Sequence, residues 1–191
     1  MIAPNTPSAG RYPAELEQDL VLRDGSRLHV RPIRPDDAER LISLYDRLSR
    51  HTAYQRFFSI MRRLPPDWAR LLANVDYVRR LALVATVDSD PAAEIVAVAR
   101  FEPTSDPASV EVAFVVADGW QNRGLGTILF RRLMDAARAR GVVGFRAWVL
   151  ADNTRMLDLI ARLGDVHART LEQGVVELVF SGQRPAPASR D

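Results

Sequence analysis

Hydrophobic residues change their spacing partway along the 191-residue chain, and this change separates helical from extended segments. Residues 20–30 carry two short apolar runs around Asp24-Gly25, a pair that favours the tight turn of a hairpin. Beyond the hairpin, apolar residues recur every three to four positions, as they do on one face of a helix. We expect helices at residues 37–48, capped by Asp36, at residues 52–61, and at residues 65–74, opened by Pro65-Pro66.

From residue 80 onward the pattern favours strands. The predicted strands are 81–87, 95–101, 110–116, 142–150 and 175–180, and helices at 124–140 and 153–163 separate the later ones. This order predicts one mixed α/β sheet with helices on its faces. We place the domain at residues 19–181, and we expect residues 1–18 and 182–191, which are rich in Pro, Ser and Ala, to be flexible tails.

The amino-acid composition excludes several kinds of functional site. The chain has no cysteine, which excludes disulfides, thiolate metal sites and a cysteine acyl-enzyme. His29, His51 and His167 do not share a helical metal-ligand spacing, so we expect no metal. All 26 basic side chains are arginines, dispersed among 24 acidic ones, which argues against a nucleic-acid partner.

No segment has the length and apolarity of a signal-peptide core or a membrane span. We therefore expect a cytoplasmic protein without a membrane partner. The sequence leaves a monomer and a homodimer equally open.

Residues 121–127, Gln-Asn-Arg-Gly-Leu-Gly-Thr, lie between a predicted strand and an amphipathic helix. Glycines at such a junction allow close backbone approach, and the first N–H groups of a helix lack intrahelical partners. With the helix dipole and Arg123, they make an anion site suited to a pyrophosphate. A nucleotide P-loop requires a lysine, and a dinucleotide fingerprint requires a glycine where Leu129 stands. A simple turn at Gly124 and Gly126 remains the alternative.

The wider pattern resembles the GNAT superfamily of N-acetyltransferases. Residues 121–126 match its Gln/Arg-x-x-Gly-x-Gly/Ala signature for the pyrophosphate of acetyl-CoA. Phe114, Val115 and Val116 resemble its splayed strand, which pairs with the pantetheine arm, and Asn153 resembles the asparagine that opens the helix beside that arm. The resemblance implies a GNAT fold, with a central, mostly antiparallel sheet of six to seven strands flanked by helices on both faces. The residues expected to bind acetyl-CoA are Phe114, Val115, Val116, Gln121, Asn122, Arg123, Gly124, Leu125, Gly126, Thr127 and Asn153.

Within the superfamily, residues 30–37 and 49–58 are similar to the opening helices of Pat-type bacterial protein lysine acetyltransferases. Seven residues after this helix-opening asparagine, many GNAT members carry a tyrosine that can protonate the leaving thiolate. Ile160 stands at that position here, and the sequence does not name another donor.

Acyl transfer to an amine requires a base, and Glu111 is the candidate. In the alternating strand 110–116 it shares a face with Ala113 and Val115, so burial should raise its pKa. The resemblance places the catalytic glutamate of Pat-type enzymes at this point of the strand. The alternative is that Glu111 only makes an exposed sheet face soluble.

We therefore expect direct transfer of an acetyl group from acetyl-CoA to a lysine of a partner protein. The resemblance suggests acyl-CoA synthetases as targets. Two alternatives remain: an acetyltransferase for small molecules or N-terminal amines, and a non-catalytic acyl-CoA sensor.

Overall fold

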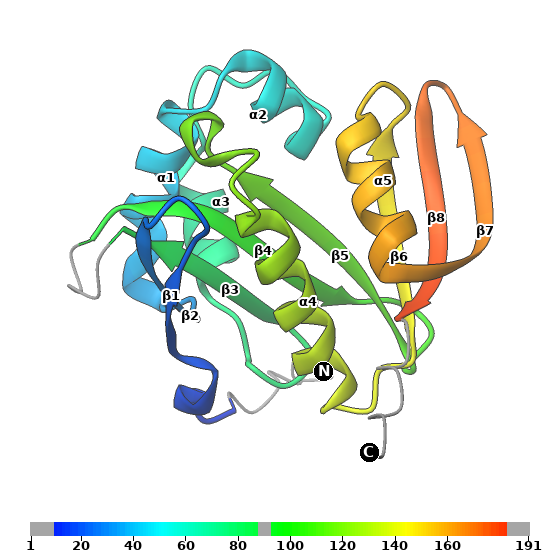
Figure 1. The fold of residues 1–191 in the computed structure, drawn as a ribbon, viewed down its shortest axis with the longest axis horizontal. Helices are drawn as coiled ribbons and strands as arrows, with labels where there is room; N and C mark the ends of the chain where they lie inside the picture. The colour runs from blue at the N-terminus through cyan, green and yellow to red at the C-terminus, as the bar shows by residue number, and fades with distance from the viewer. Residues whose placement is uncertain (1–9, 88–92, 183–191) are drawn as a thin grey trace, which may run out of the picture.

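A computed structural model describes residues 10–87 and 93–182. Within these ranges the chain forms one eight-stranded sheet with helices packed on both faces (Figure 1). The strands are β1 (Gln18–Val21), β2 (Arg27–Pro32), β3 (Leu81–Thr86), β4 (Ile95–Pro103), β5 (Ser109–Val116), β6 (Gly144–Leu150), β7 (Gly164–Glu172) and β8 (Val175–Gly182). The mixed α/β class and the largely antiparallel sheet are thus confirmed, with one strand more than the upper expectation.

The strands follow the order β1-β2-β3-β4-β5-β6-β8-β7. Each neighbouring pair is antiparallel except β5 and β6, which run parallel. A parallel pair needs a crossover, and a helix between β5 and β6 supplies it. The parallel pair therefore marks the place in the sheet where a helix begins directly after a strand end.

Two hydrophobic clusters hold the helices on the sheet. The helices are α1 (Ala38–Asp46), α2 (Arg50–Phe57), α3 (Pro66–Ala73), α4 (Leu125–Arg138) and α5 (Thr154–Leu163), with single 3-10 turns at η1 (Ala14–Leu16), η2 (Pro35–Asp37) and η3 (Asp118–Trp120). Buried residues of α4 and α5, including Leu129, Leu133 and Ile160, form one cluster with the sheet. Residues of α1, α2 and α3, including Leu41, Ala53 and Ala69, form the second on the opposite face.

Two helix boundaries differ from the prediction. Asp36 does not cap α1; the neighbouring Asp37 is the buried aspartate, and its Oδ2 accepts a hydrogen bond from the backbone N–H of Arg34 at 2.7 Å. The helix expected at residues 52–61 begins earlier, with the Ser49 hydroxyl accepting from Thr52 N–H at 3.1 Å. It also ends earlier, because Phe58 takes a left-handed conformation with φ of 51°.

The expected N-terminal tail is too long, because residues 10–18 pack on the domain. Tyr12 donates a hydrogen bond to Glu17 at 2.6 Å, and its ring meets that of Tyr77 edge to face at 5.6 Å. Gly10 N–H donates to Asp76 O at 2.8 Å. Gly182 ends β8, while residues 1–9 and 183–191 lie outside the described ranges. In the described part of the chain, no helix is both long and apolar enough to span a membrane.

Candidate active site

A cleft opens where β5 and β6 separate. The two strands pair only over their first three residues, Ser109–Glu111 with Gly144–Arg146. Beyond that point β5 pairs only with β4, and β6 only with β8. The strands diverge toward α2 and the N-terminal end of α5, as Figure 1 shows. The resulting cleft has a volume of about 1760 Å³ and is lined by residues of β5, β6, α2, α4 and α5.

One backbone edge of β5 faces this cleft. Ala117 N–H donates to Val96 O on β4 at 2.8 Å, and the backbone groups of successive strand residues point to opposite edges. Hence the N–H and C=O groups of Phe114 and Val116 point away from β4, toward the opening. The Val116 carbonyl accepts from Gln121 Nε2 at 3.1 Å, which leaves the N–H groups of this edge available to a ligand.

The loop between β5 and α4 presents a run of free donors. Asn122 and Gly124 take left-handed conformations, with φ of 62° and 85°, and α4 begins at Leu125. The first backbone bond beyond the loop is Ile128 N–H to Gly124 O at 3.1 Å. Within the described residues, the N–H groups of residues 122–127 therefore have no hydrogen-bond partner. Six such donors at the positive end of a helix dipole have the arrangement of an anion site.

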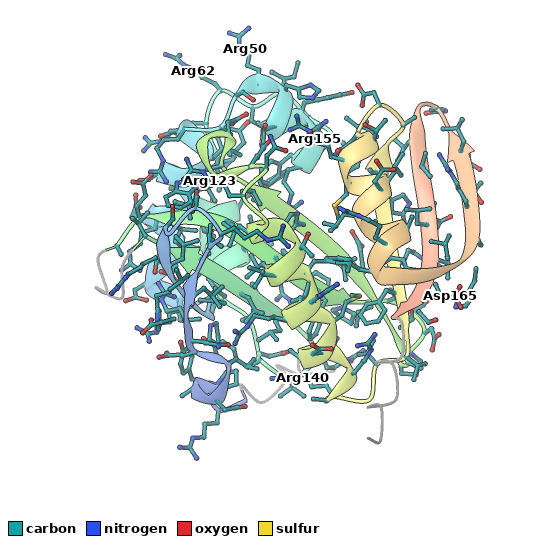
Figure 2. The ribbon with its side chains drawn as sticks, viewed as in Figure 1. Arg50, Arg62, Arg123, Arg140, Arg155 and Asp165 are labelled. Atoms are coloured by element: carbon teal, nitrogen blue, oxygen red, sulfur yellow. The ribbon has the colours of Figure 1, made fainter. Side chains whose placement is uncertain are left out.

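Side chains of the loop are partly engaged already. Arg123 Nη1 lies 3.2 Å from Asp24 Oδ2 in the β1–β2 turn, and its guanidinium covers the Trp120 ring at 4.9 Å. Figure 2 shows Arg123 on that side of the cleft and Arg155 between α2 and α5. Gln121 Oε1 accepts from Arg155 at 3.1 Å. The side chain of Leu125 is fully buried, so this residue can offer a ligand only its backbone.

The remaining predicted cofactor residues surround the same opening. Gly126 leaves little room for a side chain, because a Cβ there would lie 3.2 Å from Phe114 Cζ. Asn122, Val115 and Thr127 line the cleft. Asn153 also lines it and caps α5, with Oδ1 accepting from Met156 N–H at 3.2 Å. Apart from the buried Leu125, the residues expected to bind acetyl-CoA thus line one cleft, and their role in binding stays a prediction.

The side chain of Glu111 lies on the face of β5 opposite to the one that carries Phe114. It is half-buried, at the point where β5 and β6 begin to part. Burial raises its pKa above the usual value, and the neighbouring Glu102 of β4 adds to this rise. The guanidinium groups of Arg56, Arg146 and Arg100 oppose the rise. Glu111 is thus a desolvated carboxylate in a cleft, with basicity above that of a surface glutamate.

Sequence reasoning missed Arg56. This α2 residue lines the cleft and exerts on Glu111 the largest influence of any charged neighbour. Burial lowers the pKa of Arg56 to about 10; Arg100 contributes to the lowering, and Glu111 and Glu102 oppose it. Its position on α2 is 55 residues from Glu111 along the chain (111 minus 56), so no local pattern could indicate the pairing.

The position of Ile160 and the arrangement of possible metal ligands bear on the chemistry of the cleft. Ile160, where many GNAT members have tyrosine, is fully buried in the cluster beneath α5, so that position offers no proton to the cleft. Among residues 10–87 and 93–182, no group of three or more His, Asp or Glu side chains is arranged to hold a metal ion.

Comparison with known proteins identifies the class. Residues 43–165 match the model of the acetyltransferase (GNAT) family, and the chain belongs to that family. It is 33% identical over 148 residues to an acetyltransferase of Pseudomonas aeruginosa, covering 78% of this chain and 80% of that protein.

Two further relatives are Pat proteins. The chain is 37% identical over 158 residues to the acetyltransferase Pat of Mycolicibacterium smegmatis, covering 81% of this chain but only 46% of the longer relative. Among solved structures, the GNAT domain of S. lividans PAT superposes with a TM-score of 0.79 at 36% identity, covering 89% of this chain and 99% of that domain.

Proposed function

We propose that the protein transfers an acetyl group from acetyl-CoA to a lysine side chain of a partner protein, with acyl-CoA synthetases as the first targets to test. One observation carries the proposal. A single strand, β5, brings a desolvated carboxylate, a free backbone edge and a run of free loop N–H groups to one cleft. These are the three elements that acyl transfer from a thioester requires: a base, a donor to the acyl carbonyl and a site for the carrier's phosphates.

The loop and the β5 edge would hold the acetyl-CoA. The N–H groups of residues 122–127 would bind the pyrophosphate, while Phe114 and Val116 would pair with the amide groups of the pantetheine arm. Asn153 would lie beside that arm from the α5 side. This orientation carries the thioester along β5 from the loop toward Glu111.

Glu111 would deprotonate the incoming amine. A lysine ammonium has a pKa of about 10.4, so only about one in 2,500 is neutral at pH 7. The raised pKa of Glu111 makes it a better proton acceptor than an ordinary glutamate while leaving it ionised near neutral pH. Glu111 takes one proton from the ammonium, and the neutral nitrogen then attacks the thioester carbonyl and forms the new C–N bond. The nitrogen loses its second proton to solvent as the C–S bond breaks.

Collapse of the tetrahedral intermediate breaks the C–S bond and releases CoA thiolate. The free N–H edge of β5 between the loop and Glu111 is the proposed donor to the oxyanion, because these N–H groups face the cleft. With no cysteine in the chain, no thiol relay intervenes, and the amine attacks in a ternary complex.

The acceptor class rests on the similarity of residues 30–37 and 49–58 to Pat-type opening helices, together with the Pat relatives at 36–37% identity. The test is to incubate the protein with acetyl-CoA and an acyl-CoA synthetase, and to measure acetyl-lysine by mass spectrometry. Because this chain contains no lysine, every acetyl-lysine detected belongs to the target.

Glu111→Gln is the decisive variant, and Glu172→Gln on exposed β7 is its matched control. We expect labelling of selected lysines that falls by about 10²- to 10⁴-fold in Glu111→Gln and is unchanged in the control. Labelling that survives Glu111→Gln would keep the activity and discard the base. If only small amines or peptide N-termini are acetylated, the acceptor is one of these amines and not a protein lysine. Acetyl-CoA binding without transfer to any amine would make the protein a sensor.

A further inference from the structure

The segment between β5 and α4 is bonded directly to the start of α2, the helix that carries Arg56 into the cleft. Asp118, in the 3-10 turn η3 that follows β5, accepts three hydrogen bonds from the start of α2. Its Oδ1 accepts from Ser49 Oγ at 2.7 Å and from Thr52 Oγ1 at 2.8 Å. Its Oδ2 accepts from the backbone N–H of Ser49 at 2.9 Å. Burial raises the pKa of Asp118, but these bonds outweigh that effect and lower it overall, as expected for a carboxylate that stays ionised.

Gln121 extends the connection to two more elements. Its Nε2 donates to Thr52 Oγ1 at 3.3 Å and to Val116 O at 3.1 Å, and its Oε1 accepts from Arg155 of α5. The first residue of the loop therefore joins α2, β5 and α5. Neither Asp118 nor Ser49 is among the residues that the sequence assigned to the cofactor.

The helix held in this way carries Arg56, one turn after Thr52. Arg56 has no ion pair with Glu111 among the described residues, and its guanidinium lies over the Phe57 ring at 4.9 Å. Its position near Glu111 in the cleft is therefore set by where α2 lies rather than by a bond to Glu111. The other charged groups that face Glu111 are Glu102 and Arg100 on β4 and Arg146 on β6, all on sheet strands that the loop does not move.

We propose that Asp118 is a positioning residue that ties α2 to the acetyl-CoA loop, so that an occupied loop fixes the position of α2 and keeps Arg56 near Glu111 in the cleft. The inference rests on the proposed acyl transfer. It predicts that acetyl-CoA binding orders α2, and that acceptor turnover depends on a carboxylate that touches neither substrate.

Hydrogen exchange of α2 amides tests the link without any turnover. In the wild-type protein, acetyl-CoA should slow the exchange of both residues 121–128 and residues 50–57. In Asp118→Ala the slowing should remain at the loop and disappear from α2. Asp106→Ala, a surface aspartate in the β4–β5 connection that caps its own turn, is the matched control and should behave as wild type. Protection of α2 by acetyl-CoA that persists in Asp118→Ala would overturn the proposal.

Kinetics with whichever amine the wild type acetylates gives the second test. In Asp118→Ala, kcat should fall about tenfold or more while the KM for acetyl-CoA changes less than threefold, since a misplacement of about 1 Å can cost up to about 10²-fold. The acid limb of the kcat/KM profile should move to higher pH, because withdrawal of Arg56 removes a charge that favours ionised Glu111. Arg56→Gln should move it the same way, and the double variant should be no worse than Arg56→Gln alone.

Thr52→Val, which keeps the side-chain shape but removes the hydroxyl shared by Asp118 and Gln121, covers the case in which Asp118→Ala folds poorly. It should show the same split between kcat and KM in milder form. Additive losses, or an unmoved acid limb, would mean that Asp118 only stabilises the turn. Because the exchange measurement needs no acceptor, failure of the proposed lysine activity leaves the positioning role separately decidable.

Discussion

Gly124 offers a test of the loop in which strain is added without any new contact. Its φ is 85°, and a Cβ at this position would meet no atom within 4 Å. An alanine there is therefore opposed only by its own backbone, because the left-handed conformation costs a residue with a Cβ about 1–2 kcal/mol. The substitution leaves the charges, hydrogen-bonding groups and packing of the cleft unchanged.

The expected magnitude follows directly. If Gly124→Ala keeps the native backbone, the folded state loses about 1–2 kcal/mol, which for a domain of this size lowers Tm by about 2–8 °C. If the loop escapes the strain by leaving the left-handed conformation, the free N–H groups no longer converge. The substitution then lowers the binding free energy for acetyl-CoA instead of the stability of the fold. A loss of about 1–2 kcal/mol corresponds to about a 5- to 30-fold weaker Kd.

Calorimetric titration with acetyl-CoA and rate measurements with S-acetylpantetheine, which lacks the pyrophosphate, separate the outcomes. We expect Gly124→Ala to impair acetyl-CoA and to leave S-acetylpantetheine turnover nearly unchanged. Gly119→Ala is the matched control, because Gly119 has neither a positive φ nor an atom within 4 Å of its would-be Cβ. Wild-type Kd and Tm in Gly124→Ala, or equal impairment with both acyl donors, would refute a phosphate role for the loop.

Three further outcomes are expected. Asp37→Asn should lower the free energy of unfolding by about 3–5 kcal/mol in urea titrations, because fully buried Asp37 binds Arg31 through two hydrogen bonds of 2.7 Å; exposed Asp36→Asn should cost little. Burial by itself raises the pKa of Asp37, but Arg31 and neighbouring donors lower it below the usual value, so its stabilisation is present above about pH 3.9 and is lost as the pH falls through the lower folded pKa. Gly164→Ala should lower Tm more than Gly119→Ala, because its Cβ would lie 2.6 Å from Phe180 Cδ2. Glu111→Gln should regain activity between pH 8 and 10, where lysine deprotonates without a base, and a constant ratio to wild type across that range would contradict the base assignment.

Local patterns predicted most elements because each depends on residues close together in sequence. The hairpin at Asp24-Gly25 appears where turn chemistry placed it, and α4 and α5 begin at Leu125 and Thr154, one residue after their predicted starts. The donors of residues 122–127 were likewise foreseeable, since a glycine-rich junction before a helix leaves its first N–H groups unpaired. Glu111 was found by strand alternation together with the family resemblance.

The missed strand lacked the signal on which strand prediction relies. Residues 165–169 of β7 alternate polar and apolar residues, but all of β7 except Gly164 is exposed, so the strand has no buried apolar face that would mark it as part of the core. It forms because β8 supplies a pairing edge and because Gly164 lets α5 end directly against Phe180. Residues 10–18 of the expected tail pack on the domain for a similar reason, because Tyr12 contacts Tyr77 and Arg34, which lie far from it in the sequence.

The charges around the cleft show why a site is harder to predict than a fold. Glu111 is recognised from its own strand, whereas the influence of Arg56 on its pKa comes from α2, which ends 64 residues before the loop begins (121 minus 57). Asp118 is likewise bonded to the start of α2, a distant part of the chain. A carboxylate in the turn after a strand is ordinarily interpreted as a local cap, and Asp118 does lie at such a turn. Its bonds instead go to Ser49 and Thr52, so the same residue type at the same kind of position joins two parts of the cleft. The parts of the site formed by backbone geometry follow from the sequence because they are local. The groups that shift the pKa of Glu111 do not, because Arg56 and Arg146 come from segments far from it in the sequence, and Glu102 faces it only through the register of two paired strands.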